Sequence, residues 1–172
     1  MKKYILYILL AIGFTSCEEN LDFEVKDQIT LENFFQTESD AINSVNGIYD
    51  ALGDVDLYRS RFWLIQDLAS DDCNASPALI DPNALEFDQY TLQPTNNYLE
   101  GLWRSSYQLI SRANTAIEGI PPINMSENLK KRLIGEAKFL RALSYFNLVR
   151  LFGDVPLVLE VETDLDAYLL PR

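Results

Sequence analysis

Apolar residues recur at intervals of three and four along several stretches of the chain, which is the spacing of one face of an α-helix. The first stretch, 37–52, has Thr37 as a predicted N-cap with Asp40 at the third helical position, and Gly53 ends it. Its apolar positions are Ile42, Val45, Ile48, Tyr49 and Leu52. A shorter apolar stretch, 62–68, predicts a second helix.

Two longer stretches predict the main helices. The apolar stripe over 99–120 consists of Leu99, Leu102, Trp103, Ser106, Ile110, Ala113, Ile117 and Ile120. The stripe over 126–152 consists of Leu129, Leu133, Ala137, Leu140, Ser144, Leu148 and Leu151. Pro121 and Pro122 end the first of these helices, Ser126 is a predicted N-cap, and Gly153 ends the second. Because the connection is short, the two helices should pack antiparallel.

The segment 71–97 has no sustained period and contains three prolines with many Asn and Asp residues, so we expect an irregular loop there. Loops of this length usually carry function. The residues Ala142 to Phe146 have the Ala-x3-Phe spacing of tetratricopeptide helices. Trp63 and Trp103 lie on helical stripes and are expected in the core. The predicted fold class is all-α, with tetratricopeptide-like antiparallel helix pairs and one long irregular loop.

The N-terminal residues 1–16 form a predicted secretory signal peptide. Lys2 and Lys3 precede an apolar run, 4–14, that is too short to span a membrane and ends at Thr15-Ser16-Cys17. Residues 14–17 resemble the lipobox of bacterial lipoproteins, which implies that Cys17 is acylated and becomes the new N-terminus. An ordinary secreted protein with a chance cysteine is the alternative. Residues 17–36 are then the acylated cysteine and a tether, of which 18–28 is polar and acidic.

Composition excludes several chemistries. The chain has 14 Lys and Arg against 26 Asp and Glu, no histidine and two cysteines. Without histidine there is no Ser-His-Asp triad, no Cys-His pair and no imidazole metal site, and two cysteines cannot form a thiolate zinc site. The negative charge opposes phosphate backbones, so nucleic acid is not an expected partner.

Several segments resemble the SusD/RagB family. They are Gly-Glu-Ala-Lys-Phe-Leu-Arg-Ala at 135–142, Tyr-Phe-Asn-Leu-Val-Arg-Leu-Phe-Gly-Asp-Val-Pro-Leu-Val at 145–158, Arg-Ala-Asn at 112–114, and residues 41–52. The resemblance implies an outer-membrane lipoprotein that binds a glycan or another nutrient outside the cell and delivers it to a SusC-like, TonB-dependent transporter. Family members are much longer, so it also implies that 37–172 is a SusD-like N-terminal α-helical domain, truncated relative to the family. The segment 135–158 is expected to be structural, because its aromatic and leucine residues fall at core spacing.

The predicted ligand-binding residues lie in the loop at 71–97. Sugars need aromatic faces for their C–H patches and amides or carboxylates for their hydroxyls. Asn74, Asp81 and Asn83 are the predicted polar partners and Tyr90 the predicted stacking ring. No aromatic residue lies between Cys73 and Glu86, which leaves peptides and other nutrients open as ligands.

Other functions remain as alternatives. The adjacent acids Asp71 and Asp72 suggest a lipid-anchored hydrolase as one alternative. Glycosidases, however, need two carboxylates on either side of the glycosidic bond that is cleaved. Asp71 and Asp72, together with Asp81 and Asn83, suggest a cation-binding site as a second alternative, although the ligand spacing of an EF-hand is absent. A lipid-anchored helical scaffold that faces the periplasm and binds proteins is a third alternative. We expect a non-enzymatic protein with no cofactor and no metal, anchored in the outer membrane and facing the cell exterior.

Overall fold

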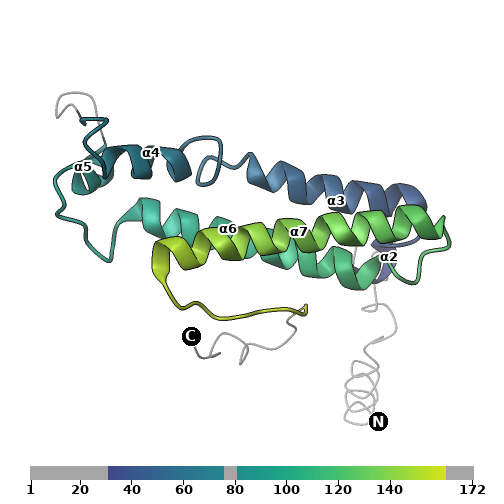
Figure 1. Cartoon of the computed structure of the whole chain (residues 1–172). Helices are drawn as coiled ribbons and strands as arrows, with labels where there is room; N and C mark the ends of the chain where they lie inside the picture. Colours follow the sequence, from purple (N-terminus) through teal and green to yellow (C-terminus); the bar gives the residue numbers. More distant parts are fainter. Residues whose placement is uncertain (1–30, 76–80, 162–172) are drawn as a thin grey trace, which may run out of the picture. The chain divides into compact units, whose positions relative to one another are not determined.

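The structure is a computed structural model that describes residues 31–75 and 81–161. Every regular element within these residues is an α-helix (Figure 1). The helices are α2 (Leu31–Phe34), α3 (Glu38–Leu52), α4 (Arg61–Leu68), α5 (Pro82–Asp88), α6 (Asn97–Gly119) and α7 (Glu127–Phe152). The predicted signal peptide, Cys17 and most of the predicted tether lie outside the described residues. The all-α fold class is confirmed.

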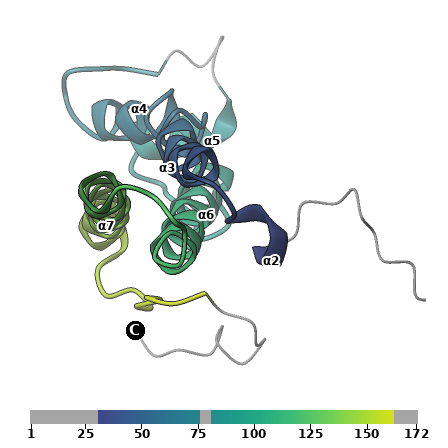
Figure 2. The same cartoon turned by 90° about the vertical axis from the view of Figure 1, so that its right-hand side faces the viewer.

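Helices α6 and α7 form the predicted antiparallel hairpin, and α3 packs against both (Figure 2). The predicted α7 stripe is confirmed, since Leu133, Ala137, Leu140 and Leu148 are all buried. Helix α6 buries more than its predicted stripe, including Leu109. Because α6 contacts α3 as well as α7, it needs a wider apolar face than a helix with one neighbour.

Both predicted ends of α3 are confirmed. The Thr37 hydroxyl accepts a hydrogen bond from the Asp40 amide (3.3 Å), and the Asp40 carboxylate accepts from the Thr37 amide (2.7 Å). The hydrogen bond from the Thr37 hydroxyl to this carboxylate (2.7 Å) is the main reason that the pKa of Asp40 is lowered. At the other end, Gly53 is the C-cap. Ser126 stands at the N-cap position of α7, but its hydroxyl makes no capping hydrogen bond, and Glu127 supplies the favourable negative charge in the first turn.

The predicted irregular loop is wrong for residues 82–88, which form helix α5. Asp81 caps this helix by accepting from the Asn83 amide (2.9 Å), and Pro82 occupies the first turn. Ala84 and Phe87 are buried, and the Phe87 ring stacks with Tyr98 of α6 at 6.4 Å between centroids. A helix of seven residues is too short to show a period and depends on its cap and on tertiary burial.

The tryptophans differ from their predicted burial. Trp63 was expected in the core but is 49% exposed, because the eight residues of α4 bury Phe62, Ile65 and Leu68 instead. Trp103 is half-buried, with its ring 5.1 Å from Phe152 and 5.0 Å from Tyr107 between centroids. An apolar stripe on a short helix therefore identifies the helix better than it identifies the buried positions.

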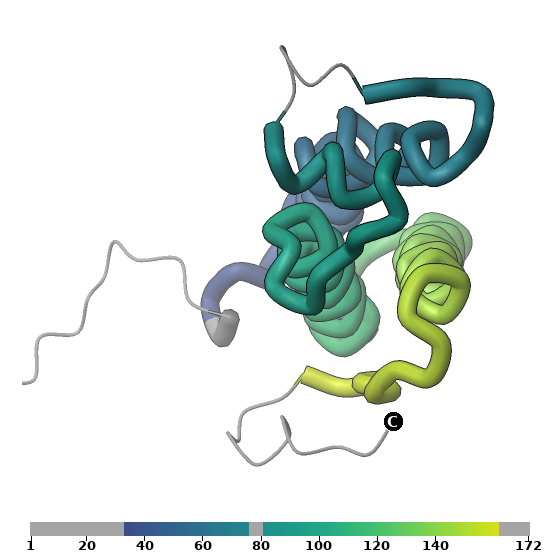
Figure 3. Tube along the Cα trace, turned by 90° about the vertical axis from the view of Figure 1, so that its left-hand side faces the viewer, coloured from purple at the N-terminus to yellow at the C-terminus, as the bar shows by residue number. Residues whose placement is uncertain are grey.

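A carboxylate joins the α3–α4 connection to α6. Asp56 is 4% exposed and forms ion pairs with Arg61 and with Arg104, the latter at 3.5 Å. A Cβ atom at Gly101 would lie 2.6 Å from the Asp56 carboxylate, so only glycine allows this approach. The Arg61 guanidinium lies 4.5 Å from the centroid of the Tyr98 ring. These contacts place α4, and with it α5, against the start of α6 (Figure 3).

Candidate functional site

The chain after α7 runs back along α6 and α7 as an extended segment, residues 154–161 (Figure 1). Side chains of both helices bind its main chain. The Tyr107 hydroxyl donates to the Pro156 carbonyl (2.7 Å), and the Tyr145 hydroxyl donates to the Val158 carbonyl (2.9 Å). The Val158 amide donates back to the Tyr145 oxygen at 2.7 Å. Burial raises the pKa of Tyr145, so its hydroxyl stays protonated at neutral pH.

Asn114 and Arg141 hold the same segment further along. The Asn114 side-chain amide donates to the carbonyls of Val158 (3.1 Å) and Glu160 (3.0 Å). Arg141 donates to the Asn114 side-chain oxygen (2.7 Å) and to the Leu159 carbonyl (2.8 Å). Asn114, Arg141 and Tyr145 thus fix the extended segment, and all three lie in segments that carry the family resemblance. The expectation that the aromatic residues of 135–158 lie at core positions is wrong for Phe139 and Phe146, which are 65% and 58% exposed.

A groove with a volume of about 540 Å³ lies between α6 and the extended segment. Its walls combine the rings of Trp103 and Tyr107 with amide, hydroxyl and charged side chains. The lining residues are Trp103, Arg104, Tyr107, Gln108, Ile110, Ser111, Asn114, Pro156, Val158 and Glu160. Aromatic faces beside hydrogen-bonding groups suit a ligand with apolar and hydroxyl-bearing sides.

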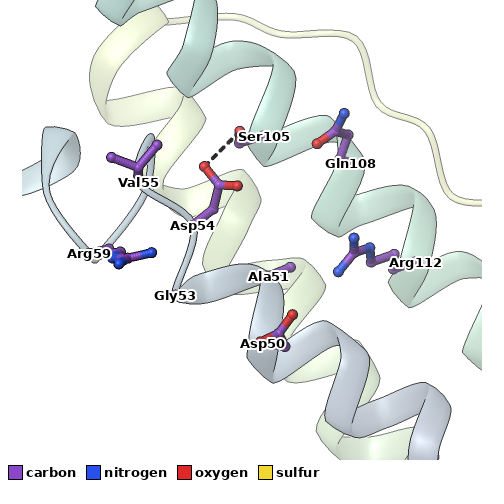
Figure 4. Close-up of a pocket in the computed structure, with 9 residues that line it drawn as sticks. All are labelled: Asp50, Ala51, Gly53, Asp54, Val55, Arg59, Ser105, Gln108 and Arg112. Carbon is purple, nitrogen blue, oxygen red and sulfur yellow. Dashed lines mark hydrogen bonds between the residues drawn. The ribbon is translucent and has the colours of Figure 1, made fainter.

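A second cavity, with a volume of about 320 Å³, lies where the end of α3 and the following turn meet α6 (Figure 4). It is polar, and its lining residues are Asp50, Ala51, Gly53, Asp54, Val55, Arg59, Ser105, Gln108 and Arg112. The Asp54 carboxylate accepts a hydrogen bond from the Ser105 hydroxyl at 3.4 Å, and Figure 4 marks this contact with a dashed line. Arg112 donates to the Gly47 carbonyl at 2.9 Å, so its guanidinium is held in place. This cavity offers acceptors and donors to hydroxyl groups.

The predicted site residues line neither of these two cavities. Asp81 and Asn83 are brought together, since the Asp81 carboxylate accepts from both the Asn83 amide (2.9 Å) and the Asn83 side chain (2.6 Å). The side-chain hydrogen bond from Asn83 is the main cause of the lowered pKa of Asp81, which is ionised at neutral pH. The Asn83 side-chain oxygen accepts from the Asn97 amide at 3.0 Å. Asn83 therefore also holds α5 against the start of α6, and Asp81 caps α5.

Tyr90 stands apart from this pair. Its side chain is 74% exposed, and its hydroxyl donates to the Ala69 carbonyl at the end of α4 (2.9 Å). Its φ of 54° makes it the one non-glycine residue with a positive φ in the part of the chain that the structure describes. Asn74 is exposed, and within residues 31–75 and 81–161 no side-chain hydrogen bond joins Asn74 or Tyr90 to Asp81 or Asn83.

The acidic residues that suggested a catalytic pair or a cation-binding site are exposed to solvent. Asp71 and Asp72 are both exposed in the turn after α4. Within residues 31–75 and 81–161, no group of three or more cysteine or acidic side chains is placed to hold a metal ion. The helices in these same ranges include none that is long and apolar enough to cross a membrane.

Residues 21–169 match the family model for SusD-like proteins described as "Starch-binding associating with outer membrane". The chain belongs to this SusD-like family. The resemblance of segments such as 135–142 and 145–158 to the SusD/RagB family is thereby confirmed, and the match extends over most of the chain.

Curated relatives have the same family name. The chain is 36% identical over 168 residues to SusD-like protein P38 of Formosa agariphila, covering 96% of this chain and 32% of the relative. It is 30% identical over 159 residues to SusD-like protein P2 of the same organism, covering 92% of this chain and 31% of the relative. The chain thus spans about a third of the length of the relatives it matches.

Solved structures share the helical arrangement. A laminarin binding SusD-like protein aligns with a TM-score of 0.66 and 27% identity, covering 77% of this chain and 29% of the other. A SusD-like carbohydrate binding protein from Bacteroides fragilis aligns with a TM-score of 0.63 and 28% identity, covering 78% of this chain and 27% of the other. The proteins in these two structures are described as a laminarin binding protein and a carbohydrate binding protein.

Proposed function

We propose that this chain is part of an outer-membrane lipoprotein that binds a glycan outside the cell and delivers it to a SusC-like, TonB-dependent transporter. The observation that carries the proposal is the match of residues 21–169 to a family described as starch-binding and outer-membrane associated. The structural neighbour described as laminarin binding supports a glycan as the ligand. The protein is proposed to be a binding protein and not an enzyme.

Tyr90 is the proposed sugar-stacking ring. Its ring is largely exposed, and the hydrogen bond to the Ala69 carbonyl fixes the direction of the side chain. A bulky residue at φ of 54° is an outlier, and such backbone strain concentrates at functional sites. A fixed, exposed ring loses little conformational entropy when a sugar stacks on it.

The proposed polar partners are Asn74, Asp81 and Asn83. Asp81 is exposed and ionised, so its carboxylate can accept hydrogen bonds from sugar hydroxyls. Asn83 donates to this carboxylate and so orients it. The aromatic groove beside Trp103 and Tyr107 is a second surface that can contact a longer glycan.

The test uses a full-length chimera in which residues 21–169 replace the aligned region of SusD-like protein P38. Laminarin and starch oligosaccharides are titrated calorimetrically. Tyr90→Ala should weaken the affinity about fivefold, because an aromatic stacking contact contributes roughly 1 kcal/mol and each 1.4 kcal/mol is tenfold. Tyr90→Phe should keep most of the affinity, since it retains the ring.

Tyr49→Ala is the matched control, because Tyr49 is an exposed tyrosine on α3 (45%). It should leave the affinity unchanged. Unchanged affinity in a folded Tyr90→Ala chimera would exclude Tyr90 from the site. A collapsed melting temperature in the same variant would show that Tyr90 has a structural role instead.

The proposed anchor is the acylated Cys17, which follows Thr15-Ser16 after a short apolar run. In Cys17→Ala, acylation should be lost and the protein should leave the membrane fraction. Cell fractionation in high salt with mass spectrometry measures this change, and retention of the variant in the outer membrane would contradict the lipoprotein assignment. Protease treatment of intact cells should digest the wild-type protein, whereas a scaffold that faces the periplasm would be protected.

A further inference from the structure

Two arginines line the polar cavity between the end of α3 and α6. They are Arg59 and Arg112, and the cavity has a volume of about 320 Å³. Among the described residues, neither guanidinium forms an ion pair, whereas the neighbouring Arg61 and Arg104 both pair with Asp56. The chain has 26 Asp and Glu against 14 Lys and Arg, so acidic side chains are plentiful, yet these two guanidinium groups remain unpaired. They are available to an anionic ligand.

The two carboxylates that line the same cavity belong to Asp50 and Asp54. Asp54 accepts hydrogen bonds from the Asp56 amide (2.8 Å) and from the Ser105 hydroxyl (3.4 Å), which hold its carboxylate toward the turn and α6. Asp50 is exposed and forms no ion pair with a described residue. Both carboxylates can accept hydrogen bonds from hydroxyl groups. The cavity thus combines guanidinium donors with carboxylate acceptors.

The shape of the cavity is fixed by the fold. Arg112 extends from α6 toward α3, where its guanidinium donates to the Gly47 carbonyl at 2.9 Å (Figure 4). The other N–H groups of this guanidinium can bind a ligand. Ala51 and Gly53 line the cavity with the smallest side chains, which keeps it open. A side chain that is already held in place loses little conformational entropy when a ligand binds.

A sugar with an acidic group matches this combination of side chains. A guanidinium binds the oxygens of a carboxylate through paired, charge-assisted hydrogen bonds, and it can bind those of a sulfate group in the same way. The ring hydroxyls of the same sugar can donate to the Asp50 carboxylate and bond with the Gln108 side-chain amide. The volume lies at the lower end of the roughly 300–1,000 Å³ of small-molecule pockets, which suits a single sugar residue.

We propose that the polar cavity is a subsite for an acidic sugar residue, one that carries a carboxylate or a sulfate group. Arg59 and Arg112 bind the acidic group, while Asp50 and Gln108 bind hydroxyl groups. The inference rests on the proposed glycan binding and adds a class of glycan and a second position on the chain, since none of the proposed loop contacts lines this cavity. Gln108 also lines the aromatic groove, so a longer glycan can continue across α6.

The experiment titrates glucuronate, glucose 6-sulfate and glucose into the P38 chimera described above. Saturation-transfer NMR measures the weak affinities of single sugars. At least one of the two acidic sugars should bind on the order of tenfold more tightly than glucose, because hydrogen bonds between charged groups are stronger than neutral ones. The comparison of glucuronate with glucose 6-sulfate shows which acidic group the cavity prefers.

Two variants test the arginines. Arg59→Gln and Arg112→Gln should each weaken the binding of the preferred acidic sugar on the order of tenfold and leave the binding of glucose unchanged. Arg59 is exposed and forms no ion pair with a described residue, so its replacement should keep the melting temperature. Lys138→Gln is the matched control, because it removes the same charge from the exposed side of α7, away from the cavity, and should leave both affinities unchanged.

The outcomes separate this inference from the proposed function. Equal affinities for the three sugars, or undiminished binding of the acidic sugar in both arginine variants, would overturn the subsite. If laminarin or starch oligosaccharides still bind in that case, the proposed glycan binding stands. Absence of binding to every one of these sugars would contradict both. If the dipeptide Ala-Ala bound more tightly than either acidic sugar and lost affinity in Arg59→Gln, the cavity would be a peptide site, which would also overturn the inference.

Discussion

Leu140→Ala should lower the free energy of unfolding by about 2–5 kcal/mol, the range for removing a large aliphatic side chain from a close-packed core. Leu140 is 1% exposed, belongs to the main core cluster and lies in the middle of the α7 stripe that packs in the hairpin. The loss is a large part of the roughly 5–15 kcal/mol that holds a domain folded. Denaturant titration followed by circular dichroism measures it.

Phe139→Ala is the matched control, because it removes a larger side chain from the adjacent position on the opposite side of α7. Phe139 is 65% exposed, so its loss should change the free energy of unfolding by less than about 0.5 kcal/mol. A loss below about 1 kcal/mol for Leu140→Ala, or equal losses for the two variants, would contradict the described packing of the hairpin.

Asn114→Ala should release the extended segment at 156–161 from the helical hairpin. Asn114 is 1% exposed and binds the carbonyls of Val158 and Glu160, and it accepts a hydrogen bond from Arg141. The substitution leaves these groups without their partner, at a cost of about 1–3 kcal/mol. Hydrogen exchange should show faster exchange of the amides in this segment, with the Val158 amide as the main reporter.

Ser111→Ala serves as the control for this variant, since Ser111 is an exposed residue one turn earlier on α6. Its exchange pattern should match the wild type. Unchanged protection of the Val158 amide in Asn114→Ala would mean that Tyr145, together with Tyr107 and Arg141, fixes the segment without Asn114. Faster exchange throughout α6 and α7 would mean that Asn114 stabilises the whole hairpin and not only the attachment of the extended segment.

Helix positions could be predicted because their signals are local. The Thr37–Asp40 capping box joins atoms three residues apart, and Gly53 ends the same helix. The long stripes of α6 and α7 cover many turns, so their period is clear. The short helix α5 was missed, because seven residues show no period and its burial comes from contact with Tyr98.

The segments that resemble the SusD/RagB family, such as 135–142 and 145–158, identified the family without showing what their residues do. Asn114 contacts carbonyls 44 and 46 residues further along the chain, and Arg141 contacts one 18 residues further along. No local pattern links such positions, so the fixing of the extended segment followed only from the tertiary structure. The exposure of Trp63 followed in the same way, from which face of α4 meets its neighbours.

The sequence by itself determined the helical fold and the antiparallel hairpin, because periodicity and capping depend on residues that are close together in the chain. Its composition excluded histidine-dependent chemistry, and the resemblance of segments such as 135–142 and 145–158 identified the family. It also singled out Tyr90, Asn74, Asp81 and Asn83 as candidate ligand contacts. The tertiary structure alone decided that Asp81 and Asn83 hold α5 in place, and that the Tyr90 ring is fixed through the Ala69 carbonyl. It also decided that Phe139, Phe146 and Val149 on α7 are exposed in the part of the chain that the structure describes. Exposure and long-range hydrogen bonding depend on what packs against each side chain, and that is set by the assembled fold.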